Sequence, residues 1–129
     1  MKTKTYKRKV IEFEVYYRRA WSGWQSAAVT DYHAILVHQA TLKMSYELIV
    51  ARPVITIEFD YPLHNPTKLT FCRPTGFTRR DLIACVHKGY EKIYSNIRKY
   101  GVWGHSMSDL VLVGMYRKSP GLYELGIDS

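Results

Sequence analysis

The segment KYGVWGHSMSDLVL, residues 99–112, holds the side chains best suited to chemistry. His105, Ser106 and Asp109 are residue types of a nucleophilic triad. The members of a triad usually come from separate structural elements, and neighbours in one short loop rarely reach the required geometry. No G-x-S-x-G turn accompanies them. We interpret Asp109 as a partner for backbone groups before the next strand, and Trp103 as a hydrophobic plug after a helix end. An enzyme with a site near His105 is the third of three functional interpretations.

A second candidate site is a cluster of arginines before a predicted helix. The segment CRPTGFTRR carries Arg73, Arg79 and Arg80 to the helix N-terminus, where free N–H groups and the macrodipole favour an anion. Arginine opposes the dipole there, so a phosphate or carboxylate partner would explain the choice. Alternatively, Asp81, Asp60 or a neighbouring loop acid neutralises the cluster within the fold, or the arginines are solvated. Our hypothesis is that the cluster binds an anion.

A third candidate is the basic N-terminal arm. Lys7, Arg8 and Lys9 precede a predicted strand that carries Tyr16 and Arg18 on its polar face. Interleaved basic and aromatic residues on a sheet bind single-stranded nucleic acid, with about 1–3 kcal/mol for each stacked base. The glycine-aromatic signature of an RNA-recognition sheet is absent. A solvated tail is therefore an equally good interpretation.

No pattern predicts a metal or a cofactor. His33 and His38 are five residues apart, which is poor spacing for a shared metal on a strand or a helix. The sequence has no H-E-x-x-H, P-loop or dinucleotide-binding fingerprint. Glu58 and Asp60 share one face of a predicted strand, but Lys68 across a hairpin offers an ordinary cross-strand partner.

Composition bounds the class of protein. The 129 residues fit a single domain over residues 1–129, with a formal net charge of +8 and 47% hydrophobic residues. No segment approaches the roughly 18 apolar residues of a membrane span, and we see no secretory signal. We expect a soluble, intracellular protein, in which Cys72 and Cys85 are two buried thiols.

Alternation of polar and apolar residues predicts strands in the first half of the chain. The predicted strands cover 9–18, 41–48, 54–61 and 68–72, with the last two as a hairpin, and 29–38 is ambiguous between helix and strand. A terminal hairpin over 109–128 turns around Ser119, Pro120 and Gly121.

One long helix is predicted over residues 79–100. Thr78 and Asp81 have the spacing of a capping box, and Phe77 and Leu82 that of a hydrophobic staple. Apolar residues then recur at three- and four-residue intervals; they are Leu82, Val86, Tyr90, Ile93 and Ile97. Gly101 fits the left-handed residue after a helix, with Val102 against Ile97. The predicted fold class is α+β: a mostly antiparallel sheet packed by this helix.

Residues 77–129 resemble a group of small uncharacterised proteins of large double-stranded DNA viruses of eukaryotes. The resemblance rests on the helix, on YGVWGHSMSDLVL and on the closing ELGIDS. It implies a viral protein, acting in host cytoplasm, nucleus or virion, and transfers no catalytic residue.

From these patterns we expect a non-enzymatic interaction module, a subunit of a larger protein assembly. Eleven tyrosines and three tryptophans exceed what a core of this size needs, and exposed aromatic residues anchor protein interfaces. The alternative is a nucleic-acid-binding accessory protein that uses the N-terminal arm and the arginine cluster. The oligomeric state is left open.

Overall fold

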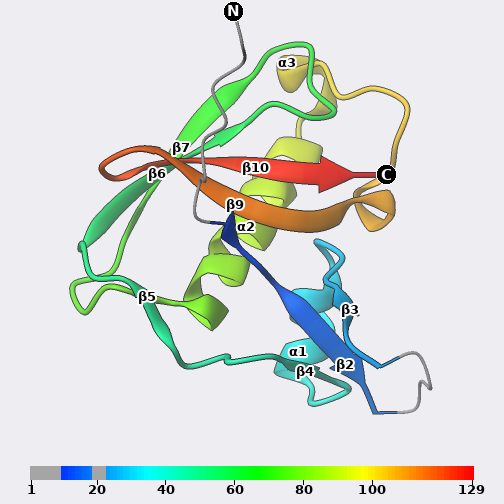
Figure 1. The fold of residues 1–129 in the computed structure, drawn as a ribbon. Coiled ribbons are helices and arrows are strands. Elements are labelled where there is room, and N and C mark those ends of the chain that lie inside the picture. Colours follow the sequence, from blue (N-terminus) through cyan, green and yellow to red (C-terminus); the bar gives the residue numbers. More distant parts are fainter. Residues whose placement is uncertain (1–9, 19–22) are drawn as a thin grey trace, which may run out of the picture.

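The computed structural model describes residues 10–18 and 23–129. Their elements form three sheets and a few helices, and the α+β class is confirmed (Figure 1). The largest sheet has five strands in the order β1 (Val10–Ile11), β9 (Val111–Ser119), β10 (Leu122–Asp128), β6 (Val54–Phe59) and β7 (Thr67–Cys72). The smaller sheets are β3 (Gln25–Ser26), β2 (Glu14–Tyr17) and β4 (Ala40–Leu42), and β5 (Leu48–Val50) with β8 (Phe77–Thr78). The helices are α1 (Asp31–Leu36), α2 (Arg79–Tyr94), α3 (Ile97–Tyr100) and the 3-10 turn η1 (Met107–Asp109).

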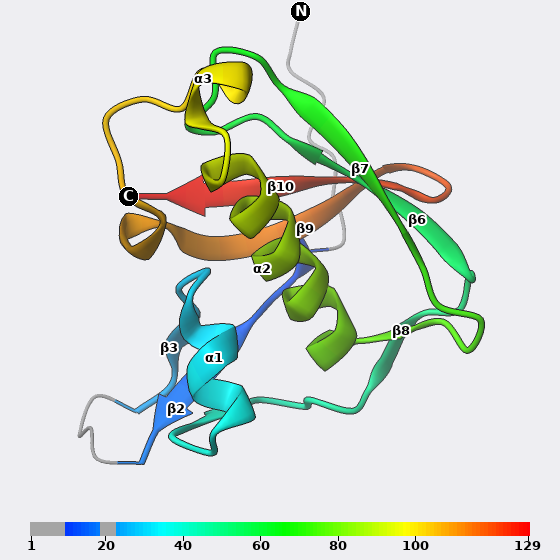
Figure 2. The same cartoon turned by 180° about the vertical axis from the view of Figure 1, so that it is seen from behind.

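Two hairpins joined by helix α2 build the large sheet. The predicted hairpin of β6 and β7 forms with Glu58 opposite Lys68, and the predicted terminal hairpin forms between β9 and β10. Strand β10 returns beside β6 and runs parallel to it, so the sheet is mixed. Helix α2 lies across one face of this sheet, as Figure 2 shows from behind.

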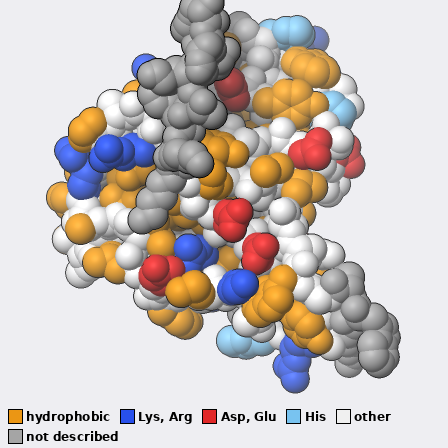
Figure 3. Space-filling view, viewed as in Figure 1, with side chains coloured by type: hydrophobic (Ala, Val, Ile, Leu, Met, Phe, Trp, Pro, Cys, Tyr) orange, Lys and Arg blue, Asp and Glu red, His pale blue; other side chains and the backbone are white. Residues whose placement is uncertain are grey.

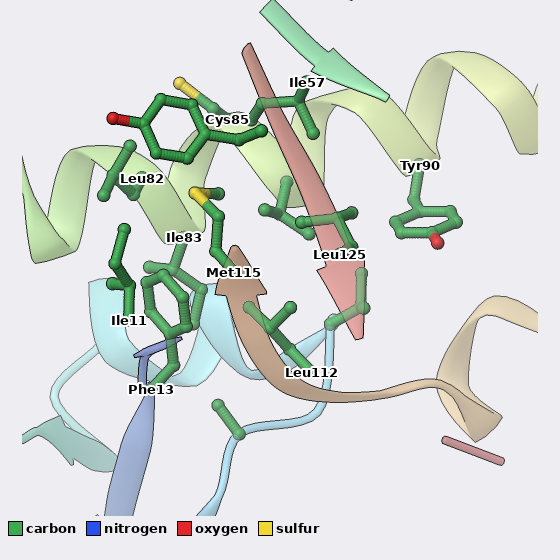
Figure 4. Packing of buried hydrophobic residues seen from close by; sticks show 14 of the residues in the cluster. Ile11, Phe13, Ile57, Leu82, Ile83, Cys85, Tyr90, Leu112, Met115 and Leu125 are labelled. Atoms are coloured by element: carbon green, nitrogen blue, oxygen red, sulfur yellow. The ribbon is translucent and has the colours of Figure 1, made fainter. Parts of the chain in front are cut away.

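The core lies between α2 and the inward side chains of the sheet (Figure 4). From the helix, Leu82, Val86, Tyr90 and Ile93 are fully buried, as their spacing predicts. From the strands come Ile55, Ile57, Phe59, Leu112 and Met115, which are also fully buried. Each such side chain contributes about 1.5–3 kcal/mol by leaving water, so this layer fixes where the helix lies.

The start of helix α2 matches the prediction, but its end does not. The Thr78 Oγ1 accepts from the Asp81 N–H at 3.1 Å, and the Asp81 carboxylate accepts from the Thr78 N–H at 2.9 Å. The helix ends at Tyr94, and Asn96, with φ −146° and ψ 69°, starts the separate turn α3 by accepting from the Lys99 N–H. Ile97 is consequently exposed rather than part of the apolar stripe.

The helix α3 ends as predicted. Gly101 is left-handed, with φ 64°, and the Val102 N–H donates to the Ile97 carbonyl oxygen at 3.0 Å. A glycine is required because an L side chain is strained at this φ, and the Cβ position of Gly101 also lies 2.8 Å from the His64 Cβ.

Two predicted strands are wrong in their extent. The predicted strand 9–18 is not continuous over its described residues 10–18: β1 joins the large sheet, whereas β2 joins the three-stranded sheet. The predicted strand 41–48 ends at Leu42, and a turn follows in which Met44 has φ 51°. Its supposed inward residues Met44, Tyr46 and Leu48 are exposed. The ambiguous segment 29–38 contains the short helix α1.

The two cysteines differ, which corrects the expectation of two buried thiols. Cys72 is exposed on the edge strand β7, whereas Cys85 is buried on α2. Burial, and then the nearby charge of Asp81, raises the pKa of the Cys85 thiol to about 12. Since the thiolate is the reactive form, we expect one fast-reacting thiol in the folded chain and two in denaturant, measured with a colorimetric disulfide reagent. Two fast thiols under native conditions would contradict this placement.

Candidate interaction surface

The N-terminus of α2 has no free N–H groups to offer an anion. The Arg79 and Arg80 N–H groups donate to the carbonyl oxygens of Glu47 and Ser45 at 3.0 and 2.9 Å, and the Asp81 N–H donates to Thr78. The turn at residues 43–47 therefore caps this helix from outside. The predicted anion site therefore lacks the free backbone N–H donors that the prediction assumed.

Arg79 is held inside the fold. Its Nε donates to the Glu12 carbonyl oxygen at 2.9 Å, and its Nη1 donates to the Met44 carbonyl oxygen at 3.1 Å and to the Glu47 carboxylate at 2.7 Å. Its side chain is 13% exposed. One guanidinium thus connects α2 to the segment before β2 and to the turn 43–47.

The other predicted cationic residues do not converge with Arg79. Arg73 pairs with Asp81 at 3.2 Å, and Arg80 lies over the exposed ring of Tyr46 at 6.0 Å. Arg18 follows β2 in the three-stranded sheet. Lys7, Arg8 and Lys9 lie outside the described residues. Anion binding by these residues stays a prediction, without a common pocket for the three arginines.

Large apolar side chains gather beside this helix end. Three lie in and just after the turn 43–47, one lies on β2, and one directly precedes β3. We call these five the docking surface; they are Met44 (59% exposed), Tyr46 (77%), Leu48 (54%), Tyr16 (40%) and Trp24 (45%). Folding gains nothing from leaving so much apolar area in water.

A shallow cavity borders the docking surface at Met44. It measures about 160 Å³ and is lined by Glu12, Glu14, Lys43, Met44 and Arg79. Figure 3 shows hydrophobic side chains beside both acidic and basic ones in the lower part of this face.

Lys43 connects the cavity to the aromatic pair. Its Nζ lies 3.4 Å from the Glu14 carboxylate and 5.6 Å from the ring centroid of Trp24. The rings of Trp24 and Tyr16 are 5.7 Å apart. Aromatic residues and methionine are enriched at protein-binding surfaces, and four of the five residues of the docking surface are of these types.

The loop with His105 forms a separate cluster at the other end of α2. The Tyr61 hydroxyl lies 2.9 Å from the His105 Nε2 and 2.7 Å from the Ser129 Oγ. Trp103 packs edge-on against Tyr61 with centroids 5.5 Å apart and keeps 41% of its surface exposed, so it is an incomplete plug. Sequence analysis missed Tyr61 and Ser129 as members of this cluster, because both are distant from His105 in the chain.

The polar residues of that loop mainly cap a turn. The Ser106 N–H donates to the Asp109 carboxylate at 3.0 Å, and the two residues form a capping box on η1. His105 therefore has a tyrosine and a serine as its side-chain partners, while Asp109 faces the turn. Burial, with Asp109 and Tyr61 nearby, raises the pKa of Tyr94, whose hydroxyl donates to the His105 carbonyl oxygen.

Metal binding finds no support in residues 10–18 and 23–129, where no three His, Cys, Asp or Glu side chains lie close enough to share an ion. Within the same ranges, no helix is both long and apolar enough to cross a membrane. Comparison with protein-family models, with curated proteins and with known structures found no match for the chain.

Proposed function

We propose that this protein is a non-enzymatic protein-binding module, a subunit of a larger assembly, which binds its partner through the docking surface. The observation that carries the proposal is the exposure of Met44, Tyr46 and Leu48 in and after a turn that is hydrogen-bonded to the Arg79 side chain. A rigid apolar surface binds with less loss of conformational entropy than a mobile one. The resemblance of residues 77–129 to viral proteins supports an intracellular or virion assembly.

Loss of the apolar anchors tests the proposal. Met44→Ser with Tyr46→Ser removes two side chains that make no core contact, so the fold should persist. Each anchor of this kind is worth about 2 kcal/mol or more, which is roughly 30-fold in affinity, so the loss of both should weaken binding by more than that factor. The readout is the amount of partner that co-purifies with full-length protein from its native source, quantified by mass spectrometry.

The matched control is Val113→Ser, which alters an exposed apolar residue on the large sheet. We expect the partner to be retained by this variant and lost from the double variant. Retention of every co-purifying protein by Met44→Ser with Tyr46→Ser would refute the proposal.

Nucleic-acid binding is the second candidate function. Residues 1–9 contain five Lys or Arg and no Asp or Glu, so most of the +8 net charge belongs to this arm. The exposed Tyr16–Trp24 pair, with Lys43 over Trp24, adds rings on which bases could stack. The test is the affinity for a single-stranded oligonucleotide. A steep fall in affinity between about 50 and 200 mM salt, together with weaker binding by Trp24→Ala, would favour this candidate.

A further inference from the structure

Strand β7 is an edge strand of the large sheet (Figure 1). The Thr56 N–H donates to Gly121, away from β7, and the Arg73 N–H donates to Pro53 beside β6. Thr70 lies opposite Thr56. The N–H and C=O groups of successive residues in a strand point to opposite sides. The backbone groups of Lys68, Thr70 and Cys72 therefore point away from β6. The described part of the chain gives them no partner.

The edge is long and regular. All six residues of β7 pair with β6 without a bulge, and none of the six is proline. Lys68 is the one charge on this strand that would guard such an edge against pairing. It lies opposite Glu58, whose carboxylate accepts from Lys118 at 2.9 Å; that hydrogen bond first, and the nearby charge of Lys68 last, lower the pKa of Glu58. Leu69 and Phe71 pack against the core and remain partly exposed.

The geometry points to a second copy of this chain as the strand that pairs with β7, antiparallel to it, with Thr70 opposite Thr70 of the second copy. This register uses all three free residues of each strand; shifting it by one pair in either direction uses only two. Each Lys68 then lies opposite the uncharged Cys72 of the second copy. Leu69 lies opposite Phe71 of the second copy, which is a favourable aliphatic–aromatic pair.

The resulting dimer continues the sheet across a two-fold axis, and the self-pairing is isologous. An edge-to-edge contact buries less than the roughly 1,000 Å² of a stable interface, so association should be weak and concentration-dependent. It leaves the docking surface free, because Tyr16, Trp24 and the turn 43–47 belong to other elements.

Cysteine cross-linking tests the register. Hydrogen-bonded antiparallel residues have Cα atoms about 5.5 Å apart, within disulfide range. Thr70→Cys with Cys72→Ser should therefore form a disulfide-linked dimer at high protein concentration under mild oxidation. Lys68→Cys should also form one with the native Cys72 of the second copy.

The matched control is Lys68→Cys with Cys72→Ser, whose two new thiols would lie four residues apart, about 13 Å. This variant should stay monomeric. Equal cross-linking of the control and of Thr70→Cys with Cys72→Ser, or no cross-linking by either, would overturn the proposal.

Light scattering without cross-links gives an independent readout. The mass of the native chain should rise from 15.1 kDa towards twice that value as concentration increases. Thr70→Lys places two ammonium groups opposite each other and should weaken association roughly tenfold or more, whereas Val113→Lys should not. A concentration-independent mass of 15.1 kDa, or equal effects of the two lysines, would refute the dimer.

Discussion

Replacing Gly89 by alanine is expected to destabilise the protein by about 2–3 kcal/mol, although alanine is the better helix former by about 1 kcal/mol. Gly89 lies in the middle of α2, against the ring of Phe59. A Cβ atom at this position would lie 2.2 Å from the Phe59 Cζ. Phe59 is fully buried and packs edge-on against Tyr90 at 5.1 Å, so its ring has no free space into which to move.

Chemical denaturation of the single variant and of a double variant measures this effect. Phe59→Leu alone should also destabilise the chain, but adding it to Gly89→Ala should recover part of the loss because the smaller side chain makes room. Lys88→Ala, on the exposed side of the same helix, is the control and should change the free energy of unfolding by less than about 0.5 kcal/mol. A stabilising Gly89→Ala would mean that helix and sheet are not packed this closely.

Arg79→Ala should destabilise the chain by about 2–3 kcal/mol. The substitution leaves the carbonyl oxygens of Glu12 and Met44 without their donor and the Glu47 carboxylate without its cation. Arg79→Lys should not restore stability, since one ammonium group cannot reproduce the planar fork of donors. Both variants should also weaken partner binding, because the turn 43–47 loses its attachment to α2.

Arg80→Ala is the matched control for Arg79→Ala. Arg80 is next to Arg79 on the same helical turn, but its side chain lies over the exposed ring of Tyr46, an interaction of about 0.5–1 kcal/mol at such a site. Equilibrium unfolding in urea should separate the two variants by at least about 1 kcal/mol. Equal stabilities would show that Arg79 does not hold the turn.

Local patterns predicted the elements whose causes lie within a few residues. The capping box of Thr78 and Asp81, the left-handed Gly101 and the hairpin of β6 and β7 each depend on neighbours in the sequence or on strict alternation. The α+β class followed from these elements. The parallel pairing of β10 with β6 did not, because it depends on where α2 delivers the chain.

The candidate site was predicted less well, because long-range contacts override local patterns there. The alternation Leu42, Met44, Tyr46, Leu48 imitates a strand, yet the chain turns at Met44 to place the carbonyl oxygens of Ser45 and Glu47 on α2. Arg79 looked free to bind an anion, since its partners are 32 to 67 residues away. A non-glycine residue with positive φ, such as Met44, gives little signal in a single sequence.

The helix breaks before Ile97 for a local reason, which the apolar periodicity did not indicate. The spacing of Ile93 and Ile97 continues the helical pattern, but Asn96 accepts from the Lys99 N–H and begins a new turn. Asparagine is a strong helix N-cap, and this signal outweighed the apolar period.

Photo-cross-linking from the docking surface tests the central claim most directly. A photoreactive phenylalanine analogue in place of Tyr46, compared with the same analogue in place of Val113, should report what lies against each position in the native source. We expect one discrete protein adduct from position 46, which is lost in the Arg79→Ala background, and none from position 113. The same adducts from both positions, or nucleic acid as the sole species captured at Tyr46, would contradict the central claim.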